Sequence, residues 1–361
     1  MTAVTPDAAA ARAVLRRAVD EGQTPGAAIA AGWRDEIDLV DAVGSAGDAG
    51  PAQPDTAYDL ASLTKVTATL PVIGWLCSTG RLDLRTRVVE VLPEFGRPRP
   101  TPSGMPSGGG ELTDARRHVT VEHLLTHTSG LPDHRNYWQD GLVGPQVLSA
   151  AATEPLEAVP GSRVCYSDLG FMLLGEIATV VAGCDLDRLL AEVVTEPLGM
   201  TATGYGPRPG AAPTEPGSLG SGRPGVVHDE NAYAMGGVAG HAGLFSTVTD
   251  LAAYLAAWTA RDGSWLPPSW LDLATTDHTA VLDGHRGLGW TARGDRYDQL
   301  GGAWPATAVF HSGFTGTSLA LDRPTGRWVV LLTNDVHFGR GRGLINPLRQ
   351  AVHTALAPER S

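Results

Sequence analysis

The segment from residue 58 to residue 65 reads YDLASLTK, and an apolar run from Val66 to Cys77 follows it. The apolar run predicts a helix, and residues three positions apart share one face of a helix. Ser62 and Lys65 have that spacing, which brings the serine hydroxyl within hydrogen-bond reach of the lysine nitrogen. A neutral amine there accepts the hydroxyl proton while the serine attacks a carbonyl carbon. The spacing therefore predicts that Ser62 is a nucleophile activated by Lys65.

The composition singles out the same lysine. Of the 27 lysine and arginine residues, only Lys65 is a lysine, and the other 26 are arginine. Arginine keeps its proton near neutral pH, whereas a desolvated lysine can serve as a base. Lys65 thus stands where arginine would not serve, although one surface lysine in an arginine-biased chain would look the same in the sequence.

A second motif is Tyr166-Ser167-Asp168, which precedes an apolar run from Leu169 to Val181. Tyr166 could act as a second general base, or as the acid that protonates a leaving group. The alternative is a core tyrosine beside a helix start, because serine and aspartate are favoured helix caps.

A third motif reads HSGFTG over residues 311–316, after an apolar run from Ala306 to Phe310. Glycines at an exposed strand edge let a substrate backbone approach closely, and free N–H groups there stabilise an oxyanion. The alternative is an ordinary strand end followed by a glycine turn.

Together and in this order, the three motifs resemble the Ser-x-x-Lys, Tyr-x-Asn and Lys-Thr-Gly motifs of the serine β-lactamases, the penicillin-binding DD-peptidases and their esterase and amidase relatives. Residues 123–132, HLLTHTSGLP, are similar to a segment typical of the class C side of that family. Residues 227–232 and 236–247 resemble a narrower branch that contains bacterial cell-wall amidases and small penicillin-binding proteins. The resemblance spans residues 25–334.

The resemblance implies a role for each matching residue. Ser62 would be acylated, and Lys65 and Tyr166 would move protons. The backbone N–H groups of Ser62 and Phe314 would form an oxyanion hole. The substrate would also be bound by the remaining motif residues, which are Asp168, His311, Ser312 and Gly313.

Two of these residues depart from the family pattern. His311 replaces the lysine of the β-lactamases, and a neutral imidazole gives a substrate carboxylate less positive charge. Antibiotic hydrolysis is therefore less expected than hydrolysis of uncharged esters or amides. Asp168 replaces asparagine, so an acceptor that can be charged stands where an amide both donates and accepts. An amine-bearing substrate and a more stable Lys65 cation are both compatible with this exchange.

The hydrophobic pattern places strands at both chain ends and helices between them. We expect an α+β fold in which both chain ends build one antiparallel sheet flanked by helices and a mostly helical domain is inserted, as in β-lactamases and transpeptidases. The sheet domain would comprise residues 1–60 and 235–361, the helical domain residues 61–234, and the catalytic cleft would lie between them. Strands are expected at 27–32, 37–43, 318–321 and 328–333, helices at 8–21, 66–77, 121–125, 169–181, 186–194, 251–258 and 344–356, and irregular loops at 95–110 and 204–225.

Composition limits the partners. A net charge of −12 argues against nucleic acid, because that affinity comes largely from basic side chains. No apolar stretch approaches the roughly 20 residues of a membrane-spanning helix, so no membrane partner is expected. The first 14 residues lack a secretory signal pattern, which predicts a cytoplasmic location. The oligomeric state stays open.

Other site types fit less well. No serine has a glycine two residues away on each side, as a conventional esterase elbow requires. His123 and His127 are four residues apart with His134 nearby, but no glutamate follows His123 as a zinc-protease motif requires. No metal and no cofactor are therefore expected.

Three functions remain open. The first is hydrolysis of an amide bond in a cell-wall-derived or other small peptide-like substrate. The second is an esterase or acyltransferase acting on a small metabolite. The third is a penicillin-sensing module that is acylated without turnover.

Overall fold

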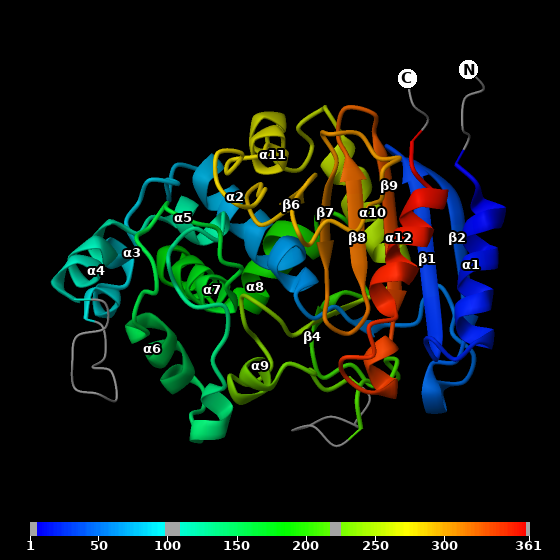
Figure 1. Cartoon of the computed structure of the whole chain (residues 1–361), viewed down its shortest axis with the longest axis horizontal. Helices are drawn as coiled ribbons and strands as arrows, with labels where there is room; N and C mark the ends of the chain where they lie inside the picture. The colour runs from blue at the N-terminus through cyan, green and yellow to red at the C-terminus, as the bar shows by residue number, and fades with distance from the viewer. Residues whose placement is uncertain (1–5, 98–108, 217–224, 359–361) are drawn as a thin grey trace.

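The computed structural model describes residues 6–97, 109–216 and 225–358, and its main element is a six-stranded antiparallel sheet. Strands from both chain ends meet in this sheet where β1 pairs with β9 (Figure 1). The α+β fold and the sheet built from both chain ends are thus confirmed. The strand order is β2 (Glu36–Gly44), β1 (Gly26–Trp33), β9 (Arg327–Thr333), β8 (Ser318–Asp322), β7 (Val309–Ser312) and β6 (Thr291–Ala292).

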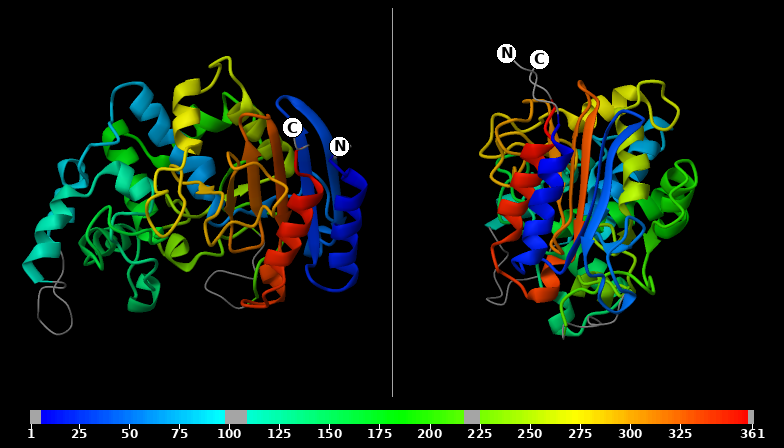
Figure 2. Two further views of the ribbon diagram at one scale, coloured as in Figure 1. Left: turned by 45° about the horizontal axis from the view of Figure 1, so that its top comes forward. Right: turned by 90° about the vertical axis from the view of Figure 1, so that its right-hand side faces the viewer.

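The two faces of the sheet bury different sets of side chains, because successive residues of a strand point to opposite faces. On β1, Ala27 and Ile29 pack against α1 (Ala8–Asp20) and α12 (Ile345–Ala355), which lie side by side on one face (Figure 2). Ala28 belongs to the apolar cluster on the other face, which α10 (Val248–Thr259) also joins. Strands β1, β8 and β9 are therefore buried on both faces, whereas the edge strand β2 is largely exposed.

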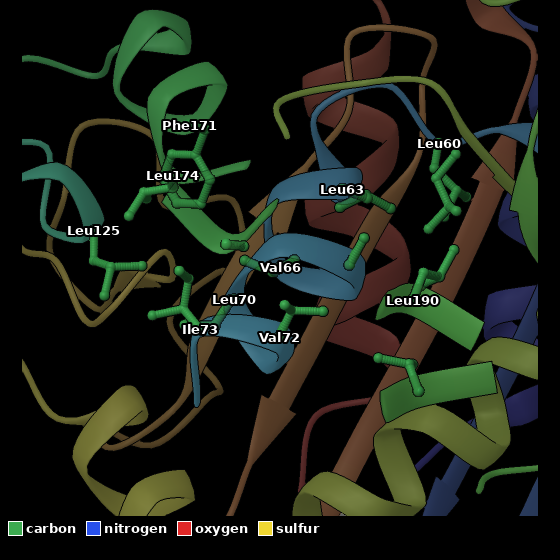
Figure 3. Close-up of a cluster of buried hydrophobic side chains, with 14 of the residues drawn as sticks. Leu60, Leu63, Val66, Leu70, Val72, Ile73, Leu125, Phe171, Leu174 and Leu190 are labelled. Carbon is green, nitrogen blue, oxygen red and sulfur yellow. The ribbon is translucent and has the colours of Figure 1, made fainter. Parts of the chain in front are cut away.

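The run that follows Ser62 packs in the large apolar cluster, to which several of the remaining helices contribute. Figure 3 shows Leu63, Val66 and Leu70 of this run among side chains such as Leu125 and Phe171. The expected helical segments are confirmed. The helices here are α2 (Leu70–Ser78), α3 (Val88–Val91), α4 (Gly109–Ala115), α5 (Val121–Leu125), α6 (Pro145–Thr153), α7 (Asp168–Ala182), α8 (Leu186–Leu190), α9 (Glu230–Ala234) and α11 (Pro268–Thr275).

Two local features differ from the sequence expectation. The backbone over Lys65–Thr69 forms a π-helical turn before α2, and such wide turns are frequent at functional sites. A second sheet joins β3 (Tyr58–Asp59), β5 (Leu244–Ser246) and β4 (Gly204–Tyr205). Its strands have two or three residues, too few for an alternating pattern to be visible in the sequence.

The division into two domains stays a prediction, and one large apolar cluster contains residues of both expected parts. The expected loops at 95–110 and 204–225 lie partly outside the described residues, at 98–108 and 217–224. No single helix in the described parts of the chain has the length and apolar character to cross a membrane, and only the bent pair Asp168–Ala182 and Leu186–Thr195 meets those measures jointly.

Candidate active site

The nucleophile position is built by a sharp turn after β3. Ala61 has a φ of 47°, a left-handed conformation that is uncommon for a residue other than glycine. The buried Asp59 carboxylate holds this turn, accepting the Ala61 N–H at 2.8 Å and the His228 N–H at 2.7 Å. Helical structure begins at Leu63, so the turn presents Ser62 at the start of the helical run.

Lys65 is fully buried, and each of its three ammonium hydrogens has an acceptor. The Nζ atom lies 2.9 Å from Ser62 Oγ, 2.7 Å from Asp168 Oδ1 and 3.2 Å from the His241 carbonyl oxygen. The predicted contact between Ser62 and Lys65 is therefore present.

The charge state of Lys65 differs from the sequence argument. Burial is the largest single influence on the pKa of Lys65 and lowers it, but the charge of Asp168 and the contribution of Tyr166 together leave that pKa above its ordinary value. Burial acts to raise the pKa of Asp168, and the Lys65 cation holds it well below the ordinary range. At rest Lys65 is an ammonium, not the neutral amine that the spacing suggested. Of the two explanations for Asp168, the contact matches a more stable Lys65 cation.

Asp168 also contacts a histidine that the motifs did not mark. Its Oδ2 atom lies 3.2 Å from His134 Nδ1, and His134 Nε2 lies 3.0 Å from Asn136 Oδ1. The hydrogen bond to Asp168 raises the pKa of His134. A second pair, His241 Nε2 and Asp229 Oδ1 at 2.9 Å, adds another carboxylate, which interacts electrostatically with Asp168. This side of the site is rich in paired charges.

Tyr166 is placed against both members of the predicted pair. Lys65 Nζ lies 5.1 Å from the centroid of the Tyr166 ring, and Ser62 and Lys65 both act on the pKa of Tyr166. The ring packs on His127 with centroids 4.5 Å apart. Burial raises the pKa of Tyr166, so the phenol keeps its proton at neutral pH. Ser167 caps α7 by accepting the Gly170 N–H at 3.3 Å, so the capping interpretation of this motif also holds, for Ser167.

The turn between β7 and β8 rests against the segment before Ser62. A Cβ atom on Gly313 would lie 2.3 Å from the Leu60 carbonyl oxygen, so only glycine fits there. The Thr317 hydroxyl donates to Leu60 O at 3.1 Å, and the Thr315 hydroxyl donates to Asp59 O at 2.7 Å. Gly313 therefore serves the approach of two protein segments, and not, as the sequence suggested, only the approach of a substrate.

This contact brings two backbone donors to one place. In the described parts of the chain, no acceptor takes the N–H of Ser62 or the N–H of Phe314. Both residues line two adjoining cavities. The Phe314 ring is stacked on His228, with centroids 5.7 Å apart and planes at 16°. The two N–H groups are thus available for an oxyanion, and their role stays a prediction.

His311 is buried on β7 and uncharged. Burial lowers its pKa to about 3, helped by the positive charges of Lys65 and Arg286. Its Nδ1 lies 3.0 Å from the Ser312 carbonyl oxygen, and its Nε2 has no partner among the described residues. The neutral imidazole expected from the sequence is present.

The cavities on the two sides of Ser62 differ in charge. One has a volume of about 400 Å³, runs along the β7 edge and is lined by four arginines and one carboxylate, Arg286, Arg340, Arg342, Arg349 and Asp335, together with His311 and Ser312. The other has a volume of about 440 Å³ and is lined by Asp168, Asp229, Glu230, His134 and Trp138. Ser62, Tyr166, Phe314 and Arg340 line both.

The arginines of the first cavity were missed because nothing local marks them. Arg286 pairs with Asp295 at 3.1 Å. Its guanidinium lies 5.7 Å from the Tyr166 ring centroid, although the two residues are far apart in the sequence. Arg340 pairs with Glu215 and Glu230. The repeated glycines around Arg340 were the one available signal, since glycine-rich segments often line sites.

The histidines considered for metal binding have other contacts. His127 Nδ1 accepts the Ser167 N–H at 3.0 Å, and His123 Nδ1 accepts the Thr120 N–H at 3.2 Å. Among the described residues, no group of three or more His, Cys, Asp or Glu side chains is arranged to hold a metal ion.

The chain is similar to several known proteins. The family model described as Beta-lactamase matches residues 11–354. An Escherichia coli K12 protein named as a D-alanyl-D-alanine carboxypeptidase is 32% identical over 78% of this chain and 70% of its own length. A Bacillus subtilis 168 protein named N-acetylmuramyl-L-alanine amidase is 31% identical over 78% of this chain and 68% of its own length. The solved structure of a penicillin-binding protein homologue from Caulobacter crescentus is 26% identical, covers 98% of both chains and has a TM-score of 0.73.

Proposed function

Because the chain belongs to the beta-lactamase family of hydrolases, we propose that it is a serine hydrolase that forms an acyl-enzyme on Ser62. The proposed reaction is hydrolysis of an amide bond in a cell-wall-derived or other small peptide-like substrate. The observation that carries the proposal is the 2.9 Å contact between Ser62 Oγ and the only lysine of the chain, with the Tyr166 ring centroid 5.1 Å from the nitrogen of that lysine.

The proposed acylation step follows from these contacts. The Ser62 Oγ atom bonds to the carbonyl carbon, and its proton leaves through Lys65 or Tyr166. The N–H groups of Ser62 and Phe314 stabilise the resulting oxyanion. When the C–N bond breaks, the departing nitrogen takes one proton from the same pair, and water later hydrolyses the ester. At rest both groups carry their protons. Lys65 or Tyr166 must therefore release one proton to solvent before it can accept the proton of Ser62.

The substrate class is supported by two observations. The similar proteins carry the names of a carboxypeptidase and an amidase of cell-wall peptides. Cavities on both sides of Ser62 suit a substrate that extends beyond both ends of the scissile bond. The cytoplasmic location stays part of this proposal.

A second candidate is an esterase or acyltransferase acting on a small metabolite. The neutral His311 favours it, because the β7 edge lacks the lysine expected for a carboxylate-bearing antibiotic. A penicillin-sensing module is the third candidate, and it would give one acylation event per chain without turnover.

One experiment separates these functions. The protein would be incubated with a panel of esters, β-lactams and muropeptides, and acyl-enzyme would be detected by intact mass and peptide mapping. We expect an adduct on Ser62, turnover of muropeptide amides, and loss of both in Ser62→Ala. Ser264→Ala, at an exposed serine, is the matched control. Ester turnover without amide turnover would select the second candidate, and an adduct on Ser167 or Ser312 would refute the assignment of Ser62.

A further inference from the structure

The proposed reaction assigns no role to Arg349, one of the buried cations of the site. Arg349 lies on α12 and is 4% exposed, although it lines the cavity along β7. Its Nη2 atom donates to the carbonyl oxygens of Gly313 at 2.6 Å and Thr317 at 3.0 Å. Its Nη1 atom donates to Gln299 Oε1 at 3.2 Å and Asn346 Oδ1 at 3.1 Å. One guanidinium therefore holds both ends of the turn that carries Phe314.

The contact with Gly313 bears directly on the Phe314 N–H group. The carbonyl of Gly313 and the N–H of Phe314 belong to one peptide unit, which is trans. In a trans peptide the C=O and N–H bonds are coplanar and point in opposite directions. Fixing the Gly313 oxygen on Arg349 therefore fixes the direction of the Phe314 N–H. The Gly313 N–H, bonded to Thr317 O at 2.8 Å, closes the same turn.

The charge of Arg349 is not neutralised by a contacting acid. Within the described ranges, its hydrogen-bond acceptors are all uncharged oxygens, and no carboxylate lies within ion-pairing distance. Burial lowers its pKa to about 10, and Asp335 opposes this from a greater distance, so Arg349 remains a cation at neutral pH. A buried charge without a partner is costly, and in a low-dielectric interior it polarises the groups bonded to it. A polarised peptide is a stronger donor at its N–H.

We propose that Arg349 is a positioning residue that orients and polarises the Gly313–Phe314 peptide, so that the Phe314 N–H is set to stabilise the oxyanion. The inference rests on the proposed function, because it needs an oxyanion next to Ser62. It gives α12 a part in orienting an oxyanion donor, through a residue that also lines the cavity along β7.

The test compares two variants at Arg349 with one at a second buried arginine. Removing one oxyanion donor costs about 10²–10³ in kcat, and weakening one costs less. We expect Arg349→Met to lower kcat by about tenfold to hundredfold while KM changes less than about threefold. Affinity for a boronic acid that forms a tetrahedral adduct on Ser62 should fall by the same factor as kcat/KM. Arg349→Lys, which keeps the charge, should recover part of the loss in kcat and part of the loss in boronic-acid affinity. It replaces Arg349→Met as the test variant if Arg349→Met does not fold.

The matched control is Arg327→Met. Arg327 is fully buried and donates to the Leu356 carbonyl oxygen at 2.8 Å, at the end of the same helix, but it lines neither cavity. Its loss should lower Tm without lowering kcat. Equal kcat losses in the two Met variants, or unchanged boronate affinity in Arg349→Met, would overturn the inference. If the wild-type protein never acylates Ser62, the proposed function itself fails, which intact mass separates from failure of the Arg349 inference alone.

Discussion

Lys65 and Arg349 are both buried cations at the candidate site, but they are held in different ways. Lys65 is 0% exposed and forms an ion pair with Asp168, which in turn contacts His134. Arg349 is 4% exposed and bonds only to uncharged oxygens in the described structure. One region of the site is thus a network of coupled acids and bases. The other is a set of backbone groups held by a permanent charge.

The two regions should therefore differ in how strongly pH affects them. Groups that exchange protons depend on pH and on the pKa values of their neighbours. Backbone donors held by an arginine do not titrate near neutral pH, because arginine stays protonated. We therefore expect changes around Lys65 to alter the rate and its pH dependence together. Changes around the β7–β8 turn should alter the rate alone.

The exchange Lys65→Arg should have the largest effect. Arginine keeps the charge, and so can keep the pairing with Asp168, but it cannot lose a proton near neutral pH. We expect kcat/KM to fall by about 10⁴-fold, the upper range for one acid or base, and acylation of Ser62 to be lost. Stopped-flow acylation and intact mass measure this. The control Arg261→Lys makes the reverse exchange in an exposed pair with Asp272. A Lys65→Arg protein with wild-type kcat/KM would remove the basis of the mechanism.

Tyr166→Phe should have the next largest effect. It removes only the phenol hydroxyl and leaves the ring packing on His127 in place. We expect kcat to fall by about 10²–10⁴-fold with little change in Tm. Steady-state kinetics and thermal unfolding together check this. An unchanged kcat would return Tyr166 to a structural role.

Whether a feature could be predicted from the sequence depends on how far apart in the chain the contacting residues lie. The pairing of Ser62 with Lys65 was predictable because three residues along a helical turn fix it. The sheet was predictable because apolar runs bounded by turn residues mark its longer strands. Tyr166 and Phe314 came from the motif resemblance, since residue chemistry alone left a core tyrosine and a plain turn equally open.

The missed residues depend on contacts that local patterns do not encode. Arg349 lies on a helix with polar and apolar faces, where an arginine is ordinarily solvent-exposed, and its partner Gly313 is 36 positions away. His134 meets Asp168 across 34 positions. The ammonium state of Lys65 follows from Asp168, which lies 103 positions away and was weighed only as one of two possibilities.

Asp168→Asn tests the coupled region through pH. Burial lowers the pKa of Lys65, and the Asp168 carboxylate raises it, so removing that charge lowers it. The neutral amine then becomes available at lower pH. We expect the ascending limb of the pH profile of kcat/KM to move to lower pH by about one to three units, the usual effect of a neighbouring opposite charge. Asp272→Asn, at a half-exposed carboxylate, is the control. If the ascending limb of the pH profile does not move, the pKa of Lys65 does not determine its position.

The smallest effect is expected for His311→Lys, which restores the lysine of the related β-lactamases. A charge-assisted contact to a carboxylate is worth about 1.5–3 kcal/mol, or about tenfold to hundredfold in affinity. Here the new amine would be buried next to Lys65 and Arg286, and both burial and those positive charges already lower the pKa of His311 to about 3. The same causes would lower the pKa of a lysine and reduce its charge. We therefore expect KM for a carboxylate-bearing β-lactam to improve by less than about tenfold, while KM for a neutral ester stays unchanged. A hundredfold improvement in KM for the β-lactam would contradict this expectation. It would show that a lysine at position 311 stays fully charged beside Lys65 and Arg286.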